Sequence, residues 1–359
     1  MAIDIRNFVD VKITKAVPGR QLEYDTVVVY DPTGTNAEGY YGTVTAGGDG
    51  TTKATAKDIT TLTGSNTVDM KAWAALFVKN GGQYIHYVKT LTYDATNDVW
   101  KNGTKEIPAT EIVICAFGNV TPGSGDVKYG SGIQQKILLV DNATNFAMAE
   151  GVVQLGKTVD NKPAIITSAA LAAYFTVINI NVADAIKDCM FTKVICTDAE
   201  ATKYVATGTL DSETYITFDY LAGAYRLLGG NDCLKNDVVN LWAKIVLTQV
   251  LSNNLITLLT SKIRLDTAGV TSVKNCCAKV LTQFVNNGYL KTDKAWTGAD
   301  LYIDGNLVAA ENTPLIDGYT VYVGPIEKKY LDAHQIPPVY ILYGDQVGVR
   351  KIVVSGEVF

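Results

Sequence analysis

The chain has 359 residues, of which 47% are hydrophobic and 19% are charged, and its formal net charge at pH 7 is −5. This length has room for about two domains, and the composition is that of an ordinary globular protein. The acidic balance and the absence of any run of Lys or Arg argue against direct contact with nucleic acid. With only 2 His in the sequence, a histidine-based catalytic site is also disfavoured.

Membrane-spanning, secreted and metal-binding proteins are disfavoured by pattern. The most apolar stretch, 238–259, contains a Lys, a Gln and several Asn, so it predicts a helix of a soluble protein and no membrane span. Asp4, Arg6 and Asp10 interrupt any apolar signal sequence. The six cysteines are scattered without a CxxC spacing, which favours free thiols in a reducing compartment. We expect no metal, no cofactor and no direct membrane contact.

Both ends of the chain have the pattern of β-strands. Residues 3–14 alternate apolar and polar side chains, which is typical of a half-buried strand. Its apolar positions are Ile3, Ile5, Val9, Val11 and Ile13. The stretch 347–358 is also strand-like, with Val349, Ile352, Val354 and Val358 among its apolar positions. These ends must pair with other strands, either in their own subunit or in a neighbour, and the pattern alone leaves both possibilities open.

Strand and helix signals alternate after the Pro18-Gly19 pair, which predicts an α/β domain. A valine-rich run at 24–31 predicts a buried strand. The stretch "DMKAWAALFVKNGG" predicts a helix with Asp69 as its N-cap and Gly81 at its end. A strand at 83–91 should then pair in parallel with the first strand.

Further elements complete this domain. We predict a loop at 32–57, strands at 110–117, 135–141, 162–168 and 213–219, and helices at 143–156 and 169–174.

The last third of the chain has a different organisation. It begins with two long helices, at 236–262 and at 266–288, the second ending at Gly288. Strand signals follow at 300–309, at 318–325 and from 339 onward. The predicted fold class is therefore an α/β domain followed by an α+β domain of a helix pair and a sheet, with extended arms at both ends. The predicted divisions are an N-terminal arm at 1–18, domains at 19–230 and 231–346, and a C-terminal arm at 347–359.

No catalytic constellation stands out. The Gly-rich stretch "TAGGDGTTKAT" lacks the GxxxxGK[ST] spacing of a phosphate-binding loop, and "GSGDVKYGSG" precedes a strand instead of opening a helix. His86 and His334 have no nucleophile in the same segment, and Asp211 and Glu213 are typical of acids at a strand end. We assign no catalytic residue, although an α/β enzyme with an unrecognised site stays an alternative.

Three stretches resemble the contractile tail sheath proteins of phages. "AWAALFVKNGGQYIHYVKTL" (72–91) is similar to that family's helix, double glycine and aromatic strand. "DYLAGAYRLLGG" (219–230) is similar to an Ala-Gly-containing helix before the C-terminal domain. The helix pair, the "NNGYL" turn (286–290) and "IPPVYILYGDQVGVRKIVVSGEVF" (336–359) resemble that C-terminal domain. The likeness is to short sheaths with a single outer α/β domain.

This resemblance implies a structural subunit that is not an enzyme. Such subunits polymerise as stacked hexameric rings around a tail tube and contract from a metastable extended state, which drives the tube through the host envelope. Both arms would complete β-sheets of neighbouring subunits. The first domain would be the outer one and the second the tube-proximal one, with Lys262, Arg264 and Lys274 as possible tube contacts. For these three side chains, an ordinary solvated face is the alternative.

The implied partners are other copies of the chain, the tail tube protein, and baseplate and tail terminator proteins. Neither nucleic acid nor a membrane would be bound directly. The implied location is the tail of a virion, assembled in the host cytoplasm. Another virion component, or a tube or sheath protein of a secretion system, stays a further alternative.

Overall fold

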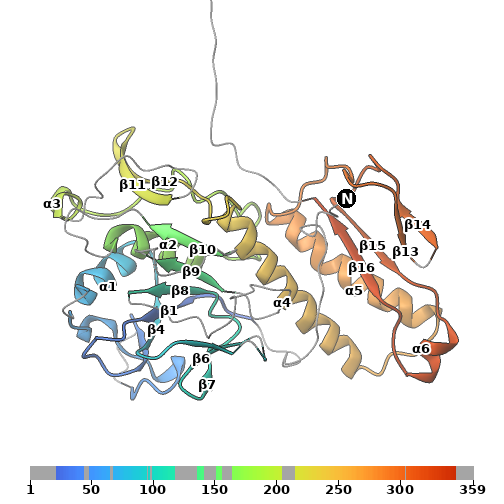
Figure 1. Ribbon diagram of the computed structural model, residues 1–359, viewed down its shortest axis with the longest axis horizontal. Helices are drawn as coiled ribbons and strands as arrows, with labels where there is room; N and C mark the ends of the chain where they lie inside the picture. The colour runs from blue at the N-terminus through green and yellow to red at the C-terminus, as the bar shows by residue number, and fades with distance from the viewer. Residues whose placement is uncertain are drawn as a thin grey trace, which may run out of the picture.

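The computed structural model describes residues 22–43, 48–64, 68–94, 96–97, 99–117, 136–140, 151–155, 164–203, 215–303 and 305–344. The predicted arms lie outside the described residues, and so do Asp211 and Glu213. Within the described part, a large sheet with its helices lies on one side of a long helix, and a second long helix with two small sheets lies on the other (Figure 1). The structure therefore contains α/β and α+β elements, as the sequence predicts.

The large sheet has nine strands in the order β12-β11-β10-β9-β8-β1-β4-β2-β3. The strands are β1 (Thr26–Tyr30), β2 (Gly39–Gly42), β3 (Lys57–Asp58), β4 (Tyr84–Val88), β8 (Val113–Ala116), β9 (Ile137–Val140), β10 (Val152–Leu155), β11 (Tyr215–Leu221) and β12 (Ala224–Leu228). All neighbours from β4 to β11 in this order pair in parallel, and so do β2 and β3 at the edge. The pairs β11–β12 and β2–β4 are antiparallel. Parallel strands of this kind must be covered on both faces.

The first strand–helix–strand unit follows the prediction. β1 is buried along its whole length and pairs in parallel with β4, Val27 lying opposite Ile85. Helix α1 (Met70–Lys79) joins the two strands, and the carboxylate of Asp69 accepts a hydrogen bond from the backbone N–H of Ala72 at 3.0 Å. Gly81 follows the helix with a φ of +100°, a conformation that glycine adopts without strain.

Four sequence predictions in this part were wrong. The predicted strand at 162–168 is occupied by α2 (Ile165–Val177), which is buried almost all round, so its continuous apolar run has no helical periodicity to detect. The predicted helix at 143–156 contains strand β10 at its end, and 143–150 lies outside the described residues. The predicted loop at 32–57 contains β2 and reaches β3. The "DYLAGAYRLLGG" stretch forms a β-hairpin from β11 and β12.

The hairpin has a local cause. Ala222 and Gly223 both have positive φ, at +50° and +79°, as a tight two-residue hairpin turn requires. Because that turn matches the twist of the flanking strands, the segment closes as a hairpin where a helix was expected.

Different layers cover the two faces of the sheet. One face carries α1, α2 and α4 (Val238–Thr260), which share a single hydrophobic core with it. The other face carries a small three-stranded sheet of β5 (Thr92–Asp94), β6 (Val99–Asn102) and β7 (Lys105–Glu106), whose Trp100 is buried against β1 and β8. The short helix α3 (Asp198–Lys203) and two 3-10 turns, Lys53–Thr55 and Ile59–Thr61, lie in connections.

The C-terminal part is built on the predicted helix pair. Helix α4 begins after Asp237, whose carboxylate accepts from the backbone N–H of Asn240 at 2.9 Å, and α5 (Thr267–Asn286) packs against it. Two antiparallel ribbons follow, formed by β13 (Leu301–Ile303) with β14 (Asn306–Ala309) and by β15 (Tyr319–Val323) with β16 (Val339–Tyr343). Helix α6 (Lys328–Asp332) connects β15 to β16.

A joint links the sheet to the helix pair. The backbone N–H groups of Asp184 and Ile186 donate to the carbonyls of Asn286 and Asn287 at 3.0 and 2.9 Å. On the other side, the side-chain amide of Gln249 on α4 donates to the carbonyl of Ala109 at 2.9 Å. The buried core therefore continues across residue 230, where the sequence predicts a domain boundary. That boundary stays a prediction.

Candidate assembly surfaces

The ribbon of β15 and β16 is the first candidate surface. Its two faces differ, because side chains alternate along each strand. Val321 and Ile341 lie opposite each other on the face that packs against α5 and the main core. Tyr319 on the same face is fixed to α5, where its hydroxyl lies 2.9 Å from Thr282 Oγ1. Leu342, on the opposite face, packs into a small cluster beneath β14. Helix α5 and this cluster therefore support the ribbon on both faces.

The edges of this ribbon can accept further strands. The backbone N–H of Gly344 donates to the carbonyl of Gly318, and that of Gly324 donates to the carbonyl of Pro338. Because the antiparallel ladder repeats every two residues, the peptide groups of Val321 point away from β16. In the part of the chain that is described, the ribbon has two strands and no third. Such an edge is a ready template for main-chain pairing with another strand.

The predicted strand-exchange residues cannot be placed on these edges. Ile3, Ile5, Val9, Val11 and Ile13 precede the described residues, and Val349, Ile352, Val354 and Val358 follow them. The described residues begin at Leu22, shortly before β1, and end at Gly344, directly after β16. In the sequence, the predicted C-terminal arm (347–359) comes shortly after β16.

The helix pair is the basic part of the molecule. Between the first residue of α4 and the last of α5, the sequence has one acidic side chain, Asp266, and the basic side chains Lys244, Lys262, Arg264, Lys274 and Lys279. Lys262 and Arg264 are exposed in the turn between the helices, and Lys274 is half-buried on α5. Lys262 and Arg264 therefore lie at the end of the helix pair where α4 leads into α5, whereas Lys274 lies further along α5. An acidic partner surface would be attracted to this end.

An exposed apolar pair marks a third surface. Tyr302 and Leu307 lie directly opposite each other on the β13–β14 ribbon, and both are more than half exposed. Ile316, in the connection that follows β14, is 80% exposed. Large apolar side chains that gather on a surface are typical of protein interfaces.

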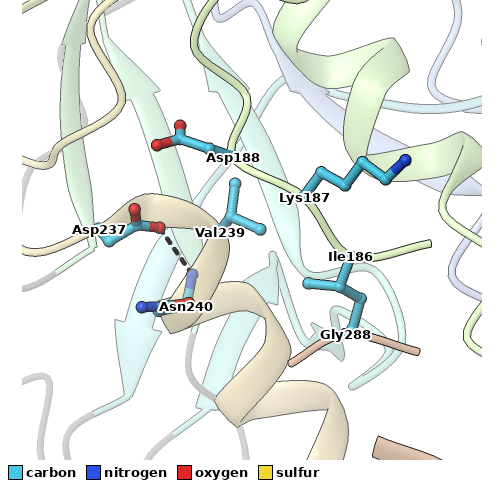
Figure 2. Close-up of a pocket in the computed structure, with 7 residues that line it drawn as sticks. All are labelled: Ile186, Lys187, Asp188, Asp237, Val239, Asn240 and Gly288. Atoms are coloured by element: carbon cyan, nitrogen blue, oxygen red, sulfur yellow. Dashed lines mark hydrogen bonds between the residues drawn. The ribbon is translucent and has the colours of Figure 1, made fainter. Parts of the chain in front are cut away.

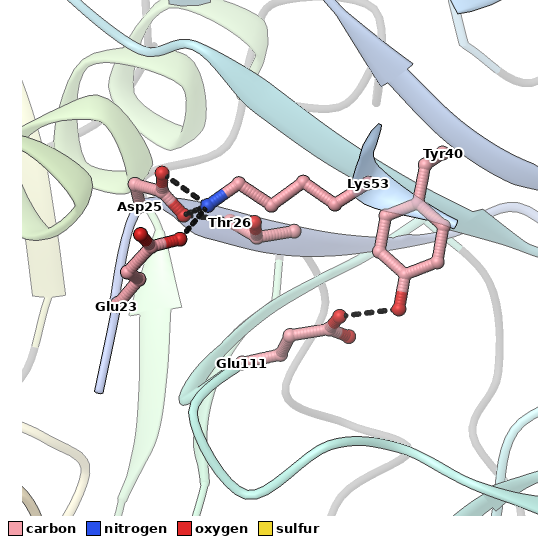
Figure 3. A network of polar contacts seen from close by, with 6 residues as sticks. All are labelled: Glu23, Asp25, Thr26, Tyr40, Lys53 and Glu111. Atoms are coloured by element: carbon pink, nitrogen blue, oxygen red, sulfur yellow. Dashed lines mark hydrogen bonds and ion pairs between the residues drawn. The ribbon is translucent and has the colours of Figure 1, made fainter. Parts of the chain in front are cut away.

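Ion pairs anchor the loop before β3 to the start of β1. The ammonium of Lys53 lies 2.5 Å from Glu23 Oε2 and 2.5 Å from Asp25 Oδ2 (Figure 3). Asp25 also accepts a hydrogen bond from the Thr26 hydroxyl. The sequence predicts only a loop around Lys53 and gives no sign of this network, because Lys53 lies 30 and 28 positions from Glu23 and Asp25.

A buried polar cluster lies at the amino ends of β8 and β9. Glu111 Oε2 is 2.7 Å from His86 Nδ1, and Glu111 Oε1 accepts a hydrogen bond from the Tyr40 hydroxyl at 2.8 Å (Figure 3 shows the latter). Lys136, which is 1% exposed, donates to the carbonyl of Pro108 at 2.5 Å. Burial lowers the pKa of Lys136 to about 7, against the opposing charge of Glu111. His86 thus has an acidic partner that no local sequence signal could reveal.

This cluster does not form a catalytic arrangement. Burial and the carboxylate of Glu111 raise the pKa of Tyr40, which keeps the phenol protonated. Within the described ranges, its groups point at one another and at backbone carbonyls, and no Ser or Cys side chain takes part in these contacts. Its structural effect is to fix the 107–111 loop, which also receives the hydrogen bond from Gln249 of α4.

A small hollow lies at the joint between the two parts of the chain. It is lined by Ile186, Lys187 and Asp188, by Asp237, Val239 and Asn240 at the start of α4, and by Gly288 after α5 (Figure 2). The carboxylate of Asp237 is engaged as the N-cap of α4. Among the described residues, no group of three or more His, Cys, Asp and Glu side chains is placed to hold a metal ion. The hollow is therefore best understood as part of the packing at the joint.

The remaining candidates from the sequence are dispersed. His334 follows α6 with a φ of +51° and is exposed, and Asp219 is exposed on β11. Cys189 and Cys277 are buried, Cys276 is half-buried, and burial raises the pKa of the Cys277 thiol to about 12. Unreactive thiols of this kind are expected inside a packed core. None of the helices in the described part is both long and apolar enough to span a membrane.

The comparisons with known proteins can now be set beside this geometry. No sequence profile of a protein family matches the chain, and no curated protein is significantly similar in sequence. A chain in the baseplate of the anti-feeding prophage has a similar structure, with a TM-score of 0.53, 10% identity and coverage of 98% of both chains. At this identity, the likeness shows the fold alone.

Two sheath tail proteins align less closely. The protein from Desulfitobacterium hafniense has a TM-score of 0.43 at 8% identity, covering 78% of this chain and 90% of that one. The protein from Listeria innocua has a TM-score of 0.41 at 10% identity, covering 77% and 87%. At these TM-scores the two alignments carry no argument about the role of this chain.

Proposed function

We propose that the chain is a structural subunit of a contractile tail sheath. The single observation that carries this proposal is the fold shared with a chain of the anti-feeding prophage baseplate over 98% of both chains. The open-edged ribbon of β15 and β16 supports it, since a polymer held together by exchanged strands needs such acceptors. Enzymatic catalysis is not part of the proposal.

The proposed assembly uses the two arms as donated strands. Residues 3–14 and 347–358 of each subunit pair with the ribbon edges of neighbouring subunits, and stacked hexameric rings form around a tail tube. A strand rises about 3.3 Å per residue, so twelve residues reach roughly 40 Å. About six main-chain hydrogen bonds, each contributing about 0.5–1.5 kcal/mol net, hold neighbouring subunits by several kcal/mol.

The proposed arrangement within the sheath follows from the helix pair. Residues 231–346 form the tube-proximal domain, with Lys262, Arg264 and Lys274 facing an acidic tube surface, and residues 19–230 form the outer domain. Contraction from a metastable extended state drives the tube through the host envelope. Further partners are the baseplate and tail terminator proteins, and the location is a virion tail assembled in the host cytoplasm.

Electron microscopy of the purified chain tests this proposal. We expect helical tubes in negative stain for the full chain, and a soluble, folded monomer after deletion of residues 1–16. Deletion of residues 347–359 should have the same effect. A discrete monomer or dimer of the full chain at all concentrations would contradict the sheath assignment. Tubes formed by both deletion variants would exclude the arms from assembly.

A further inference from the structure

The three residues before β1, which are Glu23, Tyr24 and Asp25, contact two other parts of the fold. Glu23 and Asp25 direct their carboxylates to the same ammonium, that of Lys53, with contacts of 2.5 to 2.7 Å (Figure 3). Tyr24, between them, is buried, and its ring meets the indole of Trp242 edge-on at 6.1 Å. Alternate side chains of one short segment are therefore fixed to two separate parts of the fold.

Lys53 itself comes from a firmly built turn. The carboxylate of Asp49 accepts hydrogen bonds from the hydroxyls of Thr51 and Thr55, both at 2.8 Å. The backbone N–H of Tyr40 on β2 donates to the carbonyl of Gly50 at 2.9 Å, which ties the turn to the large sheet. Such a turn presents its ammonium in one place, which reduces the entropy lost when the carboxylates bind.

The ion pairs of Lys53 also keep its ammonium group charged. Burial lowers the pKa of Lys53, but the hydrogen bonds and charges of Asp25 and Glu23 outweigh it, so that the pKa is raised overall. The ammonium is therefore charged at neutral pH. The ammonium also lies 4.8 Å from the centre of the Tyr84 ring on β4, and this cation–π contact adds a further attraction. Because the side chain of Glu23 is 62% exposed, salt weakens part of the network.

We propose that Lys53 is a positioning residue for assembly, whose ion pairs hold Glu23 and Asp25, the residues through which the predicted N-terminal arm is joined to β1. This inference rests on the proposed function, in which that arm is donated to a neighbour. An arm that leaves from a fixed point reaches its acceptor at a higher effective concentration than one whose last residues are loose. The anchor thus favours exchange between subunits without contacting the acceptor.

A matched pair of variants tests this role. Lys53→Gln removes the anchor, and Lys57→Gln removes the same charge from a nearby lysine that contacts the Glu38 carbonyl and the Tyr41 ring instead. We expect Lys53→Gln to raise the critical concentration for tube formation roughly fivefold, as the loss of a partly exposed charge network implies. Hydrogen exchange at residues 22–26 of the unassembled subunit should become faster. Lys57→Gln should resemble the wild type in both measurements.

Two further sets of variants keep the inference testable if Lys53→Gln folds poorly. Glu23→Gln, at an exposed side chain, should raise the critical concentration about twofold without affecting folding. Exchanging the charges, with Lys53→Asp and Asp25→Lys together, should restore assembly that Lys53→Asp alone weakens. Restoration by the double exchange would not be expected if Lys53 acted only through the stability of its turn.

The outcomes separate this inference from the proposed function. Unchanged assembly of Lys53→Gln, with faster exchange at residues 22–26, overturns the inference and leaves the sheath assignment intact. Equal effects of Lys53→Gln and Lys57→Gln overturn it as well, because only the net charge would then matter. Absence of tubes for the wild type contradicts the proposed function, and the inference falls with it.

Discussion

The indole ring of Trp242 stacks on the phenyl ring of Phe175, with centroids 6.0 Å apart and planes 30° from parallel. Phe175 belongs to α2, beneath the large sheet, and Trp242 belongs to the first turns of α4. Both side chains are almost inaccessible to solvent. The contact therefore joins the two predicted domains by the same kind of packing that holds each of them together.

The first prediction concerns this contact. Trp242→Ala should lower the free energy of unfolding by about 3–5 kcal/mol, the usual cost of removing a buried aromatic ring. The loss should appear in one cooperative transition, with fluorescence and circular dichroism coinciding in a urea titration. Val177→Ala, at a side chain that is 51% exposed, is the control and should change stability by less than about 0.5 kcal/mol. Two separate transitions would show that the two parts unfold independently.

The second prediction compares two buried tyrosines. The Tyr24 hydroxyl is buried and finds no hydrogen-bond partner among the described residues, whereas the Tyr87 hydroxyl donates to Asp31 Oδ2 at 2.9 Å. Tyr24→Phe should be neutral or stabilising by up to about 1 kcal/mol, because a desolvated hydroxyl is removed. Tyr87→Phe should cost about 1–3 kcal/mol, since it leaves the fully buried Asp31 without this donor. Thermal unfolding of both variants checks the difference in sign.

The third prediction is a pH dependence due to Lys136. Its pKa is about 7 in the folded chain, against 10.5, the ordinary value of a lysine, in the unfolded one. Between these values the unfolded chain binds one proton more, so the free energy of unfolding rises with pH by up to about 1.4 kcal/mol per unit. Below about pH 7 the ammonium is charged in both states, and this contribution is constant.

Urea titrations between about pH 7 and 9 measure this slope. Above that range the buried thiol of Cys115, whose pKa burial raises, contributes in the opposite sense. Lys136→Met should remove most of the rise in the free energy of unfolding with pH. Lys101→Met, at a partly exposed lysine paired with Asp94, should leave this rise unchanged. A wild-type curve that is flat from pH 7 to 9 would mean that Lys136 stays charged when buried.

The fourth prediction concerns the outer edge of β15. Val321→Pro removes an N–H group that points away from β16, so the ribbon should keep its internal ladder but lose an outward donor. We expect assembly to be strongly weakened in light scattering while the subunit stays folded. Val321→Ala, which loses similar packing but keeps the N–H group, is the control and should assemble. Equal assembly of both variants would assign the acceptor role to another edge.

Local signals were sufficient for much of the fold. The Asp69 cap, the glycine after α1 and the periodicity of α5 all act within a few residues, so the sequence predicts these helices correctly. The parallel pairing of β1 and β4 follows because a helix separates two strands. These are features in which local preference and the final fold agree.

Other features depend on contacts that no local pattern contains. Helix α2 is buried on nearly every side, which removes the periodicity that would distinguish it from a strand. Glu111 reaches His86 across 25 residues, and Lys53 reaches Asp25 across 28, only because the sheet brings their segments together. The assignment of Lys262, Arg264 and Lys274 as tube contacts stays a prediction. The ribbon edges and the anchor at Lys53 required the tertiary structure.

The turn between β11 and β12 is a suitable site for inserting a short peptide. Apart from Gly223 itself and its two chain neighbours, no described residue has an atom within 4 Å of where a side chain would begin, and the nearby Tyr220 and Leu221 are exposed. Loop tips of this kind tolerate insertions because no buried backbone group is disturbed. A short epitope grafted between Ala222 and Gly223 would give antibodies a landmark for locating each subunit along a filament.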